Sequence, residues 1–235
     1  MSAERGLPSG QSALNSRERP VDLRICTGCG ARFTNPVVAP DAPVLICEDC
    51  GQRQPFRRLP LFALTGPSGA GKSTVARLLP QALADVAVVV EQDVLWAAGL
   101  QDPVDDFAEF RRVWLRMAGM IHQSGRPVVL VGTVVPEQFE RRPERVFVGE
   151  IHYLALVADP DVLRSRLRAR PAWRGWDEPR IAETVGFNDW LRREGPTLDP
   201  PVELFDTTTV ELAETARRVV DWVRRGVDQA RNADP

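Results

Sequence analysis

Short apolar runs separated by longer amphipathic stretches make up most of the chain beyond residue 60. Five of these runs predict β-strands, at residues 61–65, 86–90, 127–131, 153–158 and 202–205. The run at 86–90 is mainly valine, which is typical of a strand buried on both faces of a parallel sheet.

Between the strands, apolar residues recur at helical spacing. Helices are expected from near residue 72 to about 83, and at 107–122, 161–170 and 210–227. Strands that alternate with helices predict an α/β fold, with a parallel sheet covered on both faces in a three-layer sandwich.

Ligands of such sheets bind outside the carboxyl ends of the strands. In this chain those ends fall at residues 66, 91–93, 132–133 and 206–209, and several of these residues are polar or glycine. We therefore expect the functional site along this edge of the sheet.

The length of 235 residues, 43% of them hydrophobic, suits one mid-sized domain and one small domain. The boundaries predicted are 21–58 and 59–228, with tails at 1–20 and 229–235. The net charge of -2 does not indicate general attraction to nucleic acid. No apolar run is long enough for a transmembrane helix, and residues 1–20 read as a disordered tail without a secretory signal. A cytoplasmic location, where thiols stay reduced, is expected.

The chain has 30 lysine and arginine residues, and Lys72 is the single lysine among them. It lies in a segment, residues 66–74, that matches the phosphate-binding pattern G-x-x-x-x-G-K-[ST]. A lysine ammonium is compact enough to enter a narrow backbone cradle, whereas the arginine fork is broad. The pattern follows a predicted strand and precedes a predicted helix, which is the context that it requires, so we expect this chain to bind a nucleoside triphosphate.

Each residue type in this loop has a predicted role. The glycines allow the backbone to approach a phosphate, and the helix that follows turns its N–H groups toward the anion. Lys72 neutralises the β- and γ-phosphates, and the Ser73 hydroxyl is placed to bind Mg²⁺. The predicted nucleotide contacts in the loop are Gly66, Ser68, Gly69, Ala70, Gly71, Lys72, Ser73 and Thr74.

Two carboxylates, Glu91 and Asp93, follow the second predicted strand. One of them can hold Mg²⁺ or its water, and the other can accept a proton from an acceptor hydroxyl. We assign Glu91 to the metal and Asp93 to catalysis.

Arginines crowd one predicted helix and the segment after it. Several positive side chains close together repel one another unless anions lie nearby, and arginines stabilise the charge that phosphoryl transfer spreads over oxygen atoms. The alternative is a solvated basic helix. The five are Arg164, Arg166, Arg168, Arg170 and Arg174. Residues 172–179 then suit a mobile lid.

Aromatic residues and further arginines lie between Asp93 and the third strand. For Trp96 and Trp114 we favour core packing over stacking on a ligand. Trp173 and Trp176 in the lid segment are the better ligand candidates. The three arginines of this stretch, which can bind an acceptor phosphate or form a solvated face, are Arg111, Arg112 and Arg116. The two histidines have no evident acidic or serine partner, so no catalytic role is assigned to them.

All four cysteines fall in two C-x-x-C-G motifs: Cys26, Cys29, Cys47 and Cys50. Seventeen residues separate the second cysteine from the third, which is the spacing of a zinc ribbon. Four thiolates close a tetrahedral zinc site, so the site is structural rather than catalytic, and iron is the alternative metal. A domain this small needs the metal for its folding energy.

The phosphate loop, the acidic strand end and the arginine-rich segment 166–171 occur in the order found in the adenylate kinase-like group of small P-loop kinases. The chain resembles this group over residues 59–228. The group includes nucleoside and nucleotide kinases, gluconate and shikimate kinases, and chloramphenicol phosphotransferases. The loop at 206–208 is similar to the loop on the adenine side of the group's nucleotide site.

This resemblance implies roles for four side chains. Arg166 and Arg170 would contact ATP and the transferring phosphate, Asp93 would be the acid on the acceptor side, and Thr207 would lie beside the nucleotide. One departure is that residues 131–133 offer no acid at the end of the third strand, so Ser73, water and an acid at 91 or 93 would hold Mg²⁺.

The sequence thus predicts a kinase that uses ATP and Mg²⁺ and carries Zn²⁺. Its acceptor would be a small hydroxylated or phosphorylated molecule, a nucleoside or nucleotide being the favoured class. Two alternatives remain: a nucleotide-sensing adaptor with a zinc ribbon, and a kinase of nucleic-acid ends. The ribbon has a net charge of only +1, which favours a protein partner or a bracing role over nucleic acid.

Overall fold

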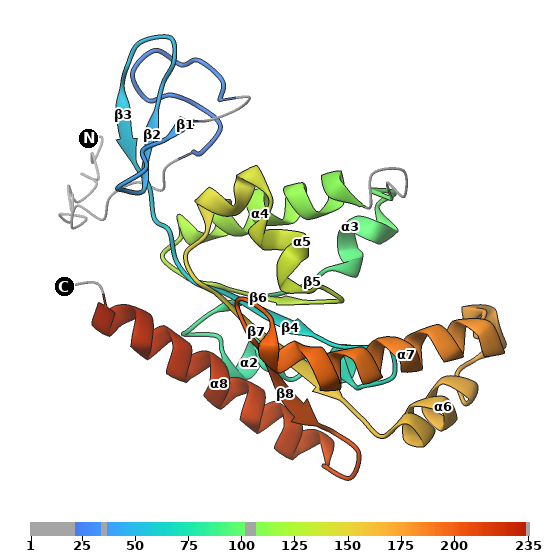
Figure 1. Cartoon of the computed structure of the whole chain (residues 1–235). Helices are drawn as coiled ribbons and strands as arrows, with labels where there is room; N and C mark the ends of the chain where they lie inside the picture. The colour runs from blue at the N-terminus through green and yellow to red at the C-terminus, as the bar shows by residue number, and fades with distance from the viewer. Residues whose placement is uncertain (1–21, 34–36, 102–106, 234–235) are drawn as a thin grey trace, which may run out of the picture.

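Two separate sheets organise the chain in the computed structural model, which describes residues 22–33, 37–101 and 107–233. Figure 1 shows the smaller sheet at one end of the molecule and the larger sheet between layers of helices. The polypeptide passes from the small sheet straight into the central strand of the large one. Within the described residues, no helix combines the length and apolarity needed to cross a bilayer.

The small sheet contains three short antiparallel strands that sequence patterns did not predict: β1 (Val37–Val38), β2 (Val44–Ile46) and β3 (Arg53–Pro55). Strands of two or three residues are too short to show a periodic pattern. We call residues 22–33 and 37–58 the ribbon.

The large sheet confirms the predicted parallel α/β fold. Its strands are β4 (Leu61–Thr65), β5 (Val88–Glu91), β6 (Val128–Val131), β7 (Ile151–Val157) and β8 (Val202–Asp206). They lie in the order β5-β6-β4-β7-β8, and every neighbouring pair is parallel. Their carboxyl ends therefore meet at one edge, with β4 in the centre.

Two expectations for this domain were wrong. The strand β5 begins at Val88 and is only half-buried, because it occupies an edge of the sheet instead of the interior. The helix expected at residues 72–83 is divided into α1 (Lys72–Ala76) and α2 (Leu79–Ala82). Pro80 has no N–H to donate back to the preceding turn, so one continuous helix cannot form there.

Helices cover both faces of the sheet (Figure 1). Alternate strand residues such as Phe62 and Leu64 pack against α1, α2 and α8 (Leu212–Ala233), while Leu61 and Ala63 pack against α4 (Ala108–His122). This alternation is the two-residue period of a strand buried on both sides. Three further helices are α3 (Asp93–Ala97), α5 (Pro136–Glu140) and α6 (Pro160–Arg168). The 3₁₀ turns are η1 (Pro143–Phe147), η2 (Ala172–Arg174) and η3 (Gly195–Thr197).

The longest missed element is α7 (Glu178–Glu194). Its apolar residues do not form one stripe, because Ile181 and Val185 join the core on one side of the sheet while Leu191 joins the core on the other. Buried Asn188 fixes it by donating to the carbonyl of Ala158 and accepting from the N–H of the same residue. A helix that serves two cores shows little helical periodicity in its sequence.

Candidate active site

The loop after β4 forms a backbone cradle that depends on glycine. Gly66 has a φ of 127°, and a Cβ built there would lie 2.2 Å from the carbonyl oxygen of Leu156. Gly69 and Gly71 also have positive φ, and Gly71 precedes the first residue of α1. The predicted turn from strand to helix is therefore present, with the helix N-terminus facing the cradle.

Lys72 folds back over this cradle. Its Nζ donates to the carbonyl oxygens of Gly66, at 2.6 Å, and Pro67, at 3.0 Å. Removal from water lowers the pKa of Lys72 to about 8, and the negative charges of Asp93 and Glu91 partly oppose this shift. The two carbonyls hold the ammonium where an anion can later replace them.

A cavity of about 170 Å³ lies beside the cradle. Glu91 and Asp93 face the loop from the end of β5, and Arg170 and Arg174 face it from the segment after α6. The loop residues that line it are Ser68, Gly69, Gly71, Lys72, Ser73 and Thr74. The carboxylates, hydroxyls and cations predicted from four separate stretches of sequence thus surround one space.

Arg166 and Thr207 lie on another side of the same loop. Arg166 donates to the carbonyl oxygens of Gly69 and Thr207, at 3.4 and 3.1 Å. The Thr207 hydroxyl is buried and donates to the carbonyl of Ala70 at 3.1 Å. Both side chains therefore join the loop after β8 to the phosphate loop, and neither lines the cavity described above.

A second, larger cavity of about 510 Å³ adjoins the first. Three residues line both cavities: Ser68, Asp93 and Thr133. The larger cavity also has an aromatic wall made by Trp96, Phe107 and Phe110. The remaining polar lining is Gln92, Arg111, Gln138 and Arg180. Asp93 therefore stands at the boundary between the two spaces.

Close packing behind Asp93 fixes its position. The buried Gln92 side chain accepts from the N–H of Thr133 at 3.0 Å, and its Oε1 would lie 1.9 Å from a Cβ built on Gly132. Glycine at 132, where an acid was missing from the pattern, is thus required so that Gln92 can reach across from β5 to β6. This contact sets the start of α3, where Asp93 is the first residue.

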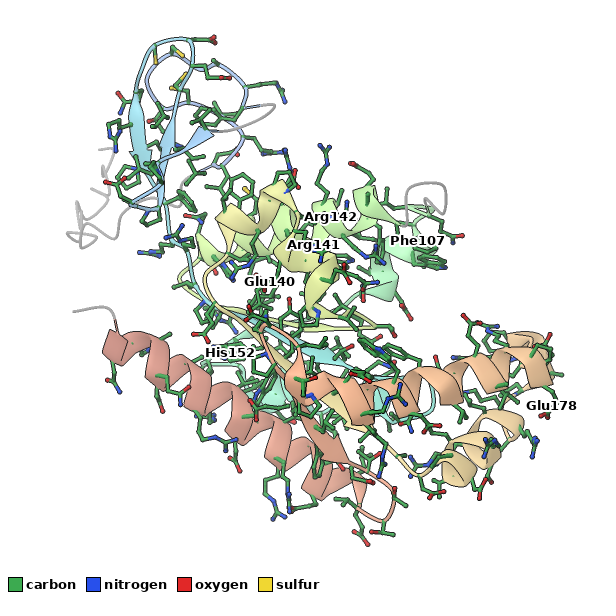
Figure 2. The ribbon with its side chains drawn as sticks, viewed as in Figure 1. Phe107, Glu140, Arg141, Arg142, His152 and Glu178 are labelled. Carbon is green, nitrogen blue, oxygen red and sulfur yellow. The ribbon has the colours of Figure 1, made fainter. Side chains whose placement is uncertain are left out.

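The predictions for the aromatic residues were right for one tryptophan and wrong for the other. Trp114 is buried in the core, at 1% exposure, whereas Trp96 is 38% exposed and lines the second cavity. Trp96 contacts Phe107 with ring centroids 5.1 Å apart. Phe107, labelled at the start of α4 in Figure 2, has a φ of 57°, a conformation that costs a residue with a side chain about 1–3 kcal/mol.

The three arginines of this region have different surroundings. Arg111 is buried and lines the second cavity, with its guanidinium 6.0 Å from the centre of the Phe107 ring. Arg112 pairs with Glu109 at 2.8 Å, and Arg116 pairs with Glu144 at 3.4 Å. Of these three arginines, Arg111 is the one that lines the second cavity, so its position fits the ligand-binding interpretation.

Sequence patterns missed Gln138 and Arg180 as candidate contacts. Gln138 comes from α5 and Arg180 from α7, two helices that were not predicted, so nothing linked these residues to the site. The histidines lie outside both cavities. His122 is fully buried, which lowers its pKa to about 4, and His152 stacks on Phe62 at 5.0 Å.

The four cysteines come together at the outer end of the ribbon, where Figure 2 shows their sulfur atoms in yellow. The Sγ atoms of Cys26 and Cys50 are 3.7 Å apart, as are those of Cys29 and Cys47, and all four lie within 4.8 Å of one another. Four thiolates about 2.3 Å from a tetrahedral zinc ion have a spacing of about 3.8 Å. The donor set and its geometry therefore fit a tetrahedral metal.

Comparisons with known proteins agree with this geometry. A family model described as an AAA domain (AAA_33) matches residues 61–192. A curated relative, the bifunctional pantoate ligase/cytidylate kinase of Acaryochloris marina, is 30% identical over 174 residues. That match covers 68% of this chain but only 30% of the relative's length.

Solved structures show the same fold. A gluconokinase from Sinorhizobium meliloti 1021 matches with a TM-score of 0.51 and 22% identity, over 76% of this chain and all of the gluconokinase. The APS kinase of Mycobacterium tuberculosis, solved with AMPPNP and APS, matches with a TM-score of 0.50 and 22% identity, over 72% of this chain and 99% of its own. The chain therefore belongs to the AAA domain family AAA_33, and its larger domain has the fold of the small P-loop kinases.

Proposed function

We propose that this protein transfers the γ-phosphoryl group of ATP to a small acceptor molecule. The observation that carries this proposal is that Asp93 lines both the phosphate cavity and the adjoining larger cavity. A donor on the phosphate loop and an acceptor in the second cavity would then meet at a carboxylate. In-line transfer requires this arrangement of donor, acceptor and base.

In the proposed reaction, an acceptor oxygen attacks the γ-phosphorus while the bond from that phosphorus to the β–γ bridging oxygen breaks. ADP leaves with the electron pair of that bond, and the Asp93 carboxylate accepts the proton of an acceptor hydroxyl. Lys72 and Arg170 neutralise the charge on the phosphoryl oxygens. Arg166 and Thr207 hold the adenine side of the loop in place.

The residues around the first cavity also fit a magnesium ion. Ser73 and Glu91 both line it and offer the oxygen ligands that Mg²⁺ prefers, in place of the acid missing after β6. Bound there, the ion would neutralise phosphate charge. At the other end of the molecule, we propose that the four cysteines bind Zn²⁺, and that the ribbon braces the fold or binds a protein partner.

The second cavity favours a nucleoside or nucleotide as the acceptor. Trp96 and Phe107 offer flat apolar surfaces, and Arg111 adds a cation. Planar rings stack on such surfaces, and an arginine fork binds phosphate. The name of the curated relative includes a cytidylate kinase, which agrees with this class of acceptor.

The first experiment is ADP release from MgATP across a panel of acceptors. The panel contains nucleosides, nucleoside monophosphates, sugar acids, hydroxylated antibiotics and 5′-hydroxyl oligonucleotides, with Lys72→Ala as the inactive control. An acceptor-dependent signal supports the proposal and identifies the acceptor class. ATP binding without turnover on any acceptor would contradict it and support the nucleotide-sensing adaptor, whereas a response to oligonucleotides alone would support the end-kinase alternative.

Asp93→Asn separates catalysis from binding. The amide keeps the shape of Asp93 but cannot accept the proton, so kcat should fall by about 10²–10⁴-fold while the affinity for ATP stays within about threefold. The matched control is Asp85→Asn, because Asp85 is exposed and lines neither cavity. A normal kcat in Asp93→Asn would remove this residue from the mechanism.

A further inference from the structure

Trp176, in the segment that joins α6 to α7, contacts two guanidinium groups. The guanidinium carbon of Arg170 is 5.0 Å from the centre of its ring, and that of Arg180 is 4.3 Å from it. The indole is half-buried and packs against the core on the α8 side of the sheet. Trp173, three residues earlier, is 79% exposed.

The two arginines that contact Trp176 line different cavities. Arg170 lines the phosphate cavity and Arg180 lines the larger cavity, but Trp176 itself lines neither. Figure 2 shows Glu178, at the start of α7, at the outer tip of the hairpin that α6 and α7 form. Arg180 is held there by donating to the carbonyl oxygens of Arg174 and Gly175, at 3.1 and 3.3 Å.

Arg170 and Arg180 both carry positive charge, so their closeness to one ring opposes their electrostatic repulsion. Burial lowers the pKa of Arg170, and so do the positive charges of Arg174 and Arg180. The face of an indole ring carries a negative quadrupole that attracts a guanidinium group on either side. Contact with Trp176 therefore offsets part of the repulsion between Arg170 and Arg180, and for Arg180 it acts together with the two backbone hydrogen bonds.

We infer that Trp176 is a positioning residue for the reaction, and not the ligand contact that its place in the lid segment predicts. Its ring holds Arg170 toward the transferring phosphoryl group and Arg180 toward the acceptor. One side chain thus sets the cations on both sides of the transfer. This inference rests on the proposed function, because it takes the two cavities as the donor and acceptor sites.

The test compares Trp176→Leu, which removes the aromatic face, with Trp176→Phe, which keeps one. Trp190→Leu is the matched control, since Trp190 is half-buried on α7, stacks on Phe187 and lines neither cavity. Circular dichroism and thermal melting first establish that each variant is folded.

We expect Trp176→Leu to lower kcat by about 10–100-fold, because misplaced charges stabilise the transition state poorly. The affinity for AMPPNP should change by less than about threefold, since Lys72 and the loop amides remain. Trp176→Phe should restore most of kcat, and Trp190→Leu should match the wild type. A wild-type kcat in Trp176→Leu would overturn the inference, as would a Trp176→Phe variant as slow as Trp176→Leu.

A binding measurement keeps this inference separate from the proposed function. Tripolyphosphate should bind Arg170 and thereby change the fluorescence of Trp176. The wild type and Trp190→Leu should show this fluorescence change, and Trp176→Phe should lose the part that comes from Trp176. If the wild-type chain transfers phosphate to no acceptor, the proposed function fails while this response still decides the role of Trp176. An equal response in wild type and Trp176→Phe would overturn the positioning role.

Discussion

Single atoms decide much of the chemistry at the phosphate loop. The hydrogen that stands in place of a side chain at Gly66 leaves room for the carbonyl of Leu156 on β7, so the loop can turn sharply where β4 ends. Lys72 places one ammonium against two carbonyl oxygens of the same loop. Both residues were identified from sequence, and the structure adds the atoms that constrain them.

Gly66→Ala should abolish nucleotide binding. The new methyl group would meet the Leu156 carbonyl, and a φ of 127° is unfavourable for alanine, so the loop must move. The measurement is AMPPNP affinity by calorimetry. Gly186→Ala is the control, because Gly186 lies within α7 with no atom near its Cβ position. Unchanged affinity in Gly66→Ala would show that the cradle is not the nucleotide site.

Nucleotide affinity should fall as the pH rises through about 8. Lys72 has a folded-state pKa of about 8 instead of the ordinary 10.5, so it is charged below pH 8 and neutral above it. The charged form of Lys72 attracts phosphate and the neutral form does not. The nucleotide affinity is therefore greatest below pH 8 and decreases by up to about tenfold for each pH unit above it. Titrations of AMPPNP between pH 6.5 and 9.5 test this. Lys72→Met should bind weakly with a flat profile in that window, and a flat wild-type profile would contradict the prediction.

At the scale of elements, α4 connects the ribbon to the second cavity. Its first turn carries Phe110 and Arg111, which line that cavity. Near its end it contacts the ribbon: Met120 packs against a cluster formed by Leu23, Leu45 and Phe56 of the ribbon and Phe147 of η1. Figure 1 shows α4 running beneath the ribbon along the sheet. One helix therefore contacts the second cavity at its first turn and the ribbon at its last turns.

Gln123, directly after α4, forms hydrogen bonds that join this helix to the ribbon. Its buried side chain accepts from the N–H of Arg57 at 2.9 Å and donates to the Arg57 carbonyl at 2.8 Å. Gln123→Ala leaves these backbone groups without that partner and should lower the free energy of unfolding by about 1–3 kcal/mol. Urea denaturation measures the loss. Gln52→Ala, at an exposed glutamine of the ribbon, should change stability by less than about 0.5 kcal/mol. Equal losses of stability in the two variants would show that the hydrogen bonds between Gln123 and Arg57 do not stabilise the fold.

At the scale of the whole molecule, two sheets have different sources of stability. The parallel sheet is buried between two large apolar clusters, whereas four of the residues that the structure describes form the buried core of the ribbon cluster, one of them from η1. A unit this small folds alone only with help from a metal or a neighbouring surface. The ribbon offers both: four thiols spaced to bind a metal, and a surface in contact with α4.

Removing the metal should therefore unfold the ribbon and leave the larger domain folded. Elemental analysis should find one zinc per chain, and a chelator should make residues 22–58 sensitive to protease while the far-UV signal of the parallel sheet and its helices persists. The acceptor KM should rise more than the ATP KM, because α4 loses its support. Zinc added back to the chelated protein is the control, and equal protease resistance with and without metal would contradict the structural role of the site.

Features that depend on residues close together in the chain could be predicted from the sequence. Glycines, a lysine and a hydroxyl at fixed spacing specify a phosphate cradle, and paired C-x-x-C motifs specify a site for a tetrahedral metal, because these geometries are built within a few residues. The alternation of apolar runs and amphipathic stretches likewise determined the parallel sheet. The break at Pro80 is also a local feature of the sequence, because a proline has no N–H to donate to the preceding turn.

The residues from distant segments that share a cavity could be identified from the packed fold alone. The edge position of β5 depends on strand order, and α7 has no single apolar stripe because two cores share it. Asp93 stands between two cavities, and Trp96 is exposed beside one of them. Trp176 contacts both Arg170 and Arg180. These arrangements join separate segments or turn a ring one way instead of another. Packing across the whole fold sets these arrangements, and the local pattern of residues does not indicate how distant segments pack.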